Sequence, residues 1–91
     1  MQFVAVIEKE PRSLYGGWFP DVPGAISVGT TLDECVASAR SSLLAWAVDA
    51  LAQGERLPSA RALQEIQADR DVKAARKRGA VFVAVPLKLW G

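Results

Sequence analysis

The side chains best suited to acid–base or metal chemistry in this 91-residue sequence are carboxylates, because the sequence contains no histidine. A two-metal nuclease site requires several carboxylates that converge on two ions. The candidates fall on a predicted strand end, in a turn and on different faces of a predicted helix: Glu8, Asp21, Asp33, Glu34 and Asp49. This dispersion argues against catalysis, and we expect neither an enzyme nor a metal or other cofactor.

The single cysteine, Cys35, lies near the start of a predicted helix, where a thiolate can be stabilised. Without a histidine to activate it, a small buried residue is the better interpretation. One cysteine cannot form an internal disulfide, which favours a reducing compartment. The N-terminus lacks the pattern of a secretory signal, and no run approaches the roughly 18 apolar residues of a membrane span. We expect a cytoplasmic protein that does not contact membranes.

The length of the chain indicates one domain over residues 1–91. The formal net charge is +1, so the protein as a whole has no strong electrostatic field that would attract nucleic acid or membranes. Lys73, Arg76 and Lys77 form a basic cluster that helical spacing brings to one side, an arrangement that suits contact with nucleic-acid phosphates. A solvated face is the preferred interpretation, because Asp69 and Asp71 lie close by and no aromatic residue is interleaved for base stacking.

The first third of the chain predicts three antiparallel strands. Residues 3–8 are nearly all apolar, at the positions of both strand faces, which is typical of a strand covered on both sides. Residues 14–19 predict a second strand, in which Gly16 and Gly17 mark a bulge or a close backbone approach. Two prolines and Gly24 predict a reversal over residues 20–24, before a short third strand over residues 25–28.

A long helix is the clearest element. Thr31 and Glu34 match a capping box, and Gly54 suits a left-handed C-terminal cap. Apolar residues spaced by three and four form the stripe that should face the sheet: Leu32, Val36, Ala39, Leu43, Ala47 and Ala50. Beside this stripe, Leu44 and Val48, with Trp46, either widen the core or serve a subunit contact.

The last third predicts a short helix over residues 60–68 capped by Ser59, a further turn or two from Asp69 or Asp71 to residue 78, and a final strand over residues 80–85. A right-handed crossover would place the final strand beside the first and parallel to it, which gives an α+β fold with sheet order 3-2-1-4. The apolar tail after Pro86 either packs on its own domain or pairs with a second copy as an added strand.

Four segments resemble the HicB-like family of antitoxins. Residues 19–24 (FPDVPG) are similar to its FPDLPG signature, and residues 29–34 to its G-x-T-L-E-E helix start; residues 4–9 and 81–86 also resemble family positions. The resemblance implies a partial RNase H-like fold, a dimer or tetramer, and an antitoxin of a type II toxin–antitoxin system that neutralises a HicA-type mRNA interferase. Many members carry a further DNA-binding module, which would begin where this chain ends, so we do not expect DNA binding.

We weigh two surfaces on this basis. A toxin-facing rim would contain residues of the second strand and the signature turn: Tyr15, Trp18, Phe19, Pro20 and Asp21. A purely structural role competes with partner binding for the turn residues, because the prolines fix φ and Asp21 can bond its own downstream amides. Burial in the core competes for the aromatic residues, and strand alternation lets only one of Trp18 and Phe19 face the core. An oligomer interface would contain apolar residues of the last strand and the tail: Val83, Leu87, Leu89 and Trp90. The alternative functions are an oligomeric domain that binds RNA or a small ligand, and a vestigial nuclease.

Overall fold

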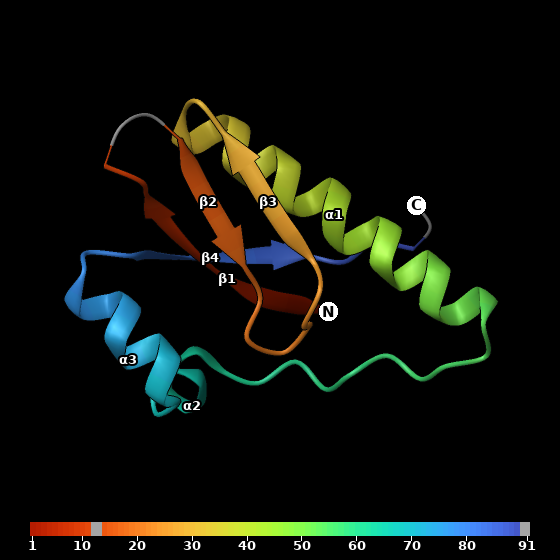
Figure 1. The fold of residues 1–91 in the computed structure, drawn as a ribbon. Helices are drawn as coiled ribbons and strands as arrows, with labels where there is room; N and C mark the ends of the chain where they lie inside the picture. Colours follow the sequence, from red (N-terminus) through yellow and green to blue (C-terminus); the bar gives the residue numbers. More distant parts are fainter. Residues whose placement is uncertain (12–13, 90–91) are drawn as a thin grey trace.

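Four antiparallel strands form one sheet, with a long helix and two short helices around it (Figure 1). The computed structural model describes residues 1–11 and 14–89. The elements in chain order are β1 (Gln2–Lys9), β2 (Tyr15–Trp18), β3 (Ile26–Gly29), α1 (Leu32–Ala52), α2 (Leu63–Ile66), α3 (Arg70–Lys77) and β4 (Val81–Pro86). The strand order is β3-β2-β1-β4, which confirms the predicted sheet order.

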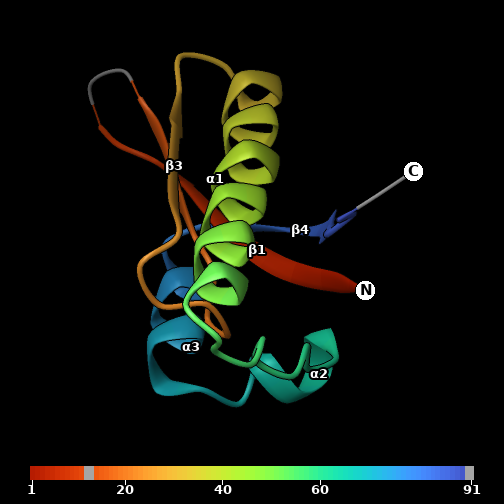
Figure 2. The ribbon, with the colours of Figure 1, turned by 90° about the vertical axis from the view of Figure 1, so that its right-hand side faces the viewer.

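The first strand is buried on both faces, as its sequence predicts. Phe3, Ala5 and Ile7 pack into a core with the inner face of α1. Val6 points the other way and packs with Ile66 of α2 and with residues of α3. The long helix runs alongside β3, as both ribbon views show (Figures 1 and 2). The sheet is therefore covered by α1 on one face and, around β1, by the two short helices on the other.

The last strand is antiparallel to β1, and the prediction of a parallel strand is wrong. Gln2 lies opposite Pro86, and Ile7 lies opposite Val81. The prediction treated the connection from β3 to β4 as one crossover helix. Such a helix would return the chain to the end of the sheet at which β1 begins, so that β4 would run parallel to β1. In the structure, an extended segment and then α2 and α3 carry the chain back to the end of β1 (Figure 1). The handedness rule for parallel crossovers therefore does not apply.

The predicted caps of α1 are present with one change. Thr31 Oγ1 accepts a hydrogen bond from the backbone N of Glu34 at 3.1 Å. The Glu34 carboxylate accepts from Thr30, one residue before the cap, at 2.9 Å from its backbone N. The Thr30 hydroxyl donates to the same carboxylate, and this bond, together with the one from the backbone N, lowers the pKa of Glu34. At the other end, Gly54 takes a φ of 77°, and Glu55 N donates to the carbonyl of Ala50 at 2.9 Å. Both ends of the helix are thereby fixed by local residues.

The inner face of α1 follows the predicted stripe from its second turn onward. Its buried residues are Cys35, Ala39, Leu43, Ala47 and Ala50. Leu32, in the first turn, is exposed, and Val36 packs at the border of the core. The interpretation of Cys35 as a small buried residue is thus confirmed.

The outer face of α1 carries apolar residues that the core does not use. Among the helices of the described residues, α1 alone has the length and mean hydropathy of a membrane span, yet its inner face packs on the sheet. Leu44, Val48 and Leu51 are 40%, 54% and 45% exposed. Leu44 and Val48 therefore do not widen the core, whereas Trp46 packs against it. A subunit contact at this face stays a prediction.

The first short helix starts later than predicted, whereas the second begins directly after Asp69, one of its two predicted caps. Helix α2 begins after Ala62, whose backbone N donates to Glu65 Oε1 at 3.0 Å, and Ser59 does not cap it. Helix α3 begins after Asp69, whose carboxylate makes no cap hydrogen bond because it binds Arg61. Residue Arg61 therefore links the segment before α2 to the start of α3.

Candidate partner-binding surface

Part of the sheet face opposite α1 has no helix over it. The short helices cover this face at β1, where Val6 is buried, and partly at its cross-strand neighbour Trp18, but not at β3. Ile26 and Val28 of β3 are 68% and 59% exposed. Between them, Ser27 points to the other face, where its hydroxyl lies 3.5 Å from Cys35 Sγ. Strand alternation thus places two β-branched apolar residues in solvent.

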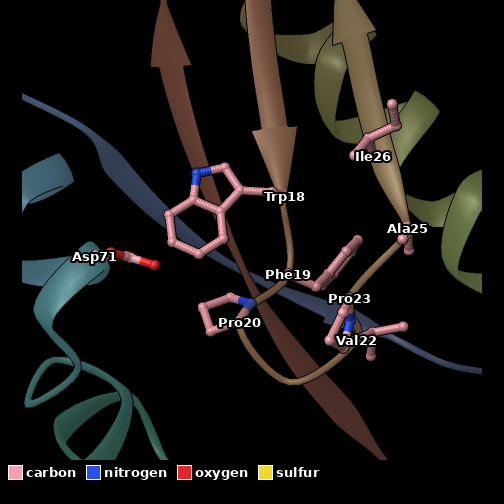
Figure 3. Close-up of a pocket in the computed structure, with 9 residues that line it drawn as sticks. Trp18, Phe19, Pro20, Val22, Pro23, Ala25, Ile26 and Asp71 are labelled. Carbon is pink, nitrogen blue, oxygen red and sulfur yellow. The ribbon is translucent and has the colours of Figure 1, made fainter.

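A pocket of about 310 Å³ lies beside these residues (Figure 3). Trp18 and Ile26, which are direct cross-strand partners, line it together with Pro20 of the signature turn. Asp71 on α3 faces the indole of Trp18 from the far side of the pocket (Figure 3). Among the described residues Asp71 makes no ion pair. We call Trp18, Pro20, Ile26, Val28 and Asp71 the open-face patch.

The structure brings together only part of the predicted toxin-facing rim. Trp18, Phe19 and Pro20 all line the pocket, but Phe19 is only 2% exposed and belongs to the core. This agrees with the expectation that one of the two aromatic residues faces inward. Tyr15 packs against the core on the α1 side, where Lys9 Nζ lies 5.9 Å from its ring centre. Ile26 and Val28 were not predicted as part of a site, because their alternation with Ser27 places them on one face of the sheet but does not show that α2 and α3 leave that face open at β3.

Asp21 has a structural partner that sequence spacing does not reveal. Its carboxylate accepts hydrogen bonds from the backbone N and the Nε of Arg61, at 2.8 and 2.6 Å. The two Nη atoms of Arg61 donate to Asp69 at 3.1 and 2.8 Å, which lowers the pKa of Asp69. The expectation that Asp21 bonds its own downstream amides is wrong, because the turn closes through backbone bonds such as Val22 N to Phe19 O. Contact of Asp21 with a partner stays a prediction.

The predicted oligomer residues pack mostly on their own domain. Leu87 is 8% exposed, and Val83 and Leu89 lie against the same core. The backbone N of Leu87 donates to the carbonyl of Met1 at 2.8 Å, so the ladder continues one residue past β4. Trp90 lies outside the described residues. Of the two alternatives for the tail, packing on its own domain is observed for Leu87 and Leu89.

The residues of the predicted basic cluster are all exposed on α3. Lys73 and Lys77 line a hollow of about 400 Å³ together with Arg70. Arg78 pairs with Glu8 at 2.8 Å, and this contact lowers the pKa of Glu8. Contact with nucleic acid through Lys73, Arg76 and Lys77 stays a prediction.

The predicted dispersion of the carboxylates is observed for three of them, which are engaged by different partners. Glu8 binds Arg78, Asp21 binds Arg61, and Glu34 binds Thr30. Within residues 1–11 and 14–89, no three histidine, cysteine or carboxylate side chains gather closely enough to hold a metal ion.

Comparison with known proteins gives one family. A family model described as HicB-like antitoxin of bacterial toxin–antitoxin systems matches residues 3–88. The crystal structure of the Burkholderia pseudomallei antitoxin HicB is 27% identical with a TM-score of 0.81; the match covers 98% of this chain and 64% of that chain. The crystal structure of the N-terminal domain of the same antitoxin is 27% identical with a TM-score of 0.80, and covers 98% of this chain and 100% of that chain.

A third similarity shows the fold alone. A chain in the structure of the HicA3 and HicB3 toxin–antitoxin complex is 20% identical with a TM-score of 0.74, and the match covers 97% of this chain and 99% of that chain. A search of curated protein sequences finds no match.

Proposed function

Because the chain belongs to the HicB-like family of bacterial antitoxins, we propose that it is the antitoxin of a HicA-type toxin and acts by binding that protein without catalysis. The match over residues 3–88 supports the family. The HicA3–HicB3 complex shows that relatives of this fold form such a pair. The role requires a surface that recognises a protein, and the open-face patch supplies one.

The observation that carries this proposal is the exposure of Ile26 and Val28 beside Trp18. Large apolar side chains that gather on a surface mark sites of protein contact more often than isolated ones do. A half-buried tryptophan next to a pocket is a typical anchor of such contacts. On this basis the toxin covers the part of the sheet that α2 and α3 leave open.

The charge at the border of the patch favours a particular partner surface. Asp71 lies at the pocket and is the charged residue among those that line it. A toxin that cleaves mRNA must carry basic groups to hold phosphates. We therefore infer that an apolar side chain of the toxin enters the pocket while a neighbouring lysine or arginine meets Asp71. Such a contact also withdraws a basic group from RNA.

Co-expression with the product of the adjacent open reading frame, followed by pull-down and a growth assay, tests the proposal. Ile26→Asp places a charge in the centre of the patch and should weaken toxin binding at least about tenfold, with loss of growth rescue. Val48→Asp is the matched control, since Val48 is a similarly exposed β-branched residue on the outer face of α1. Equal rescue by both variants, or recovery of the chain alone, contradicts the proposal.

Two further properties accompany this function. We propose a cytoplasmic location, because an antitoxin must meet its RNA-cleaving toxin there. The cytoplasm also keeps the buried Cys35 thiol reduced. We also propose that the chain forms a homo-oligomer, through a region of the sheet distant from the open-face patch.

A further inference from the structure

The two edge strands of the sheet differ in how their outward backbone groups are used. At the β3 edge, the backbone N of Val28 donates to Ser38 Oγ of α1 at 3.3 Å. At the β4 edge, no described residue offers such a partner to the outward amides. An edge strand with free N–H and C=O groups is a template for pairing with another strand. One outward amide of β3 is thus bonded within its own chain, whereas neither outward amide of β4 bonds to a described residue, which points to β4.

The outward groups of β4 follow from its ladder with β1. Leu87 N bonds to Met1 O, and in an antiparallel ladder such mutually bonded pairs recur at every second position. Val85, Val83 and Val81 thus bond to β1, and Phe82 and Ala84 present their N–H and C=O outward. Backbone groups alternate in the same way between the two neighbours of β1 and of β2. This alternation makes the N–H of Val28 point outward at β3, as its bond to Ser38 shows.

We propose that β4 pairs antiparallel with β4 of a second copy of this chain, about a two-fold axis at Val83. This register places Phe82 opposite Ala84 of the partner copy, and Ala84 opposite Phe82 of the partner copy. Each pair makes two hydrogen bonds, so all four outward N–H and C=O groups at these two positions in each chain are used. The result is a continuous eight-stranded sheet with both α1 helices on one face.

Neighbouring registers satisfy fewer groups. An axis at Ala84 would place Phe82 opposite Pro86, which has no N–H to donate. An axis at Phe82 would need the N–H of Ala80, which already donates to the carbonyl of Ala75 at 3.0 Å. In the register at Val83, every N–H that the pairing needs is present and free of other described partners, so we prefer this register.

The side chains of β4 suit pairing with themselves. Residues 81–86 contain no charged residue, although edge strands that avoid pairing commonly carry lysine or glutamate. Val81, which is 43% exposed, would meet Val85 of the partner copy, and Phe82 would meet the smaller Ala84. Each cross-strand pair in this register joins two apolar residues, which stabilises antiparallel strands.

Analytical ultracentrifugation of the full chain over a range of concentrations tests this pairing. The wild type should show a monomer–dimer equilibrium, and Ala84→Pro should shift it at least about tenfold toward monomer, since proline removes an outward N–H and leaves the bonds to β1 intact. Ala84 is exposed, so the substitution removes no core contact. Amide hydrogen exchange adds a local readout: the amides of Phe82 and Ala84 should become more protected as the wild-type concentration rises.

Two further variants keep the test decisive. Should circular dichroism show that Ala84→Pro does not fold, Ala84→Lys replaces it, because it keeps the amide and introduces a repelling charge near the axis. Val48→Asp on the outer face of α1 should leave the dimer unchanged. A wild type that stays monomeric, a dimer that survives the folded Ala84 variants, or a dimer broken by Val48→Asp instead overturns the proposal. None of these outcomes depends on toxin binding.

Discussion

Gly29 and Gly16 are strand glycines with opposite surroundings. A Cβ at Gly29 would overlap the backbone N and Cα of Cys35, where α1 passes close to the end of β3. A Cβ at Gly16 would meet nothing within 4 Å. We expect Gly29→Ala to lower the free energy of unfolding by about 2 to 3 kcal/mol, because backbone must move to make room.

Gly16→Ala is the matched control in urea unfolding experiments. It should leave the free energy of unfolding unchanged or raise it by about 0.5 kcal/mol, through a less flexible unfolded chain. Equal losses in the two variants would show that strand glycine itself, rather than the approach of α1, sets the requirement.

Arg61 also acts at the scale of a single residue, since it joins Asp21 of the signature turn to Asp69 before α3. We expect Arg61→Gln to lower the melting temperature by several degrees at neutral pH, whereas Arg56→Gln, at an exposed position, should have little effect. Arg61 lowers the pKa of Asp69, so this stabilisation is present above the unfolded pKa of about 4 and is lost as the pH falls through the lower folded value.

Melting curves of the wild type and Arg61→Gln between neutral and strongly acidic pH check this. The difference in melting temperature between the two proteins should shrink below a pH of about 4. A difference that stays constant with pH would mean that Arg61 stabilises the fold without its charge contacts.

Helix α1 offers a comparison between adjacent leucines. Leu43 is fully buried against the sheet, whereas Leu44 is 40% exposed. Leu43→Ala leaves a cavity in the core and should cost about 3 kcal/mol, whereas Leu44→Ala should cost less than about 1 kcal/mol. Chemical denaturation of the two variants measures both values. Similar losses would indicate that the outer face of α1 is covered in solution.

The elements that sequence reasoning predicted well have local causes. Thr31 and Glu34 mark the start of α1, Gly54 marks its end, and the apolar composition of β1 indicates burial on both faces. The direction of β4 could not be predicted, because it depends on where a long connection delivers the chain. The Asp21–Arg61 contact, which spans 40 positions, likewise leaves no spacing signal. The open-face patch was found in part, through Trp18 and Pro20, and its exposed β3 residues emerged only with the positions of α2 and α3.

At the scale of the whole molecule, the two proposed surfaces lie at opposite edges of one sheet. The open-face patch contains residues of β2, β3 and α3, and the self-pairing edge is β4, on the far side of β1. Neither surface needs a residue of the other. The two contacts should therefore form together, so that a dimer of this chain carries one toxin molecule at each end of the eight-stranded sheet.

Light scattering coupled to size-exclusion chromatography distinguishes this assembly from its alternatives. The wild-type chain mixed with toxin should give the mass of two chains and two toxins. Ile26→Asp should give a dimer without toxin, and Ala84→Pro should give one chain with one toxin, because each substitution removes one contact and spares the other. If toxin binding instead splits the wild-type dimer, the toxin must cover the β4 edge, and the assignment of the toxin to the open-face patch is wrong.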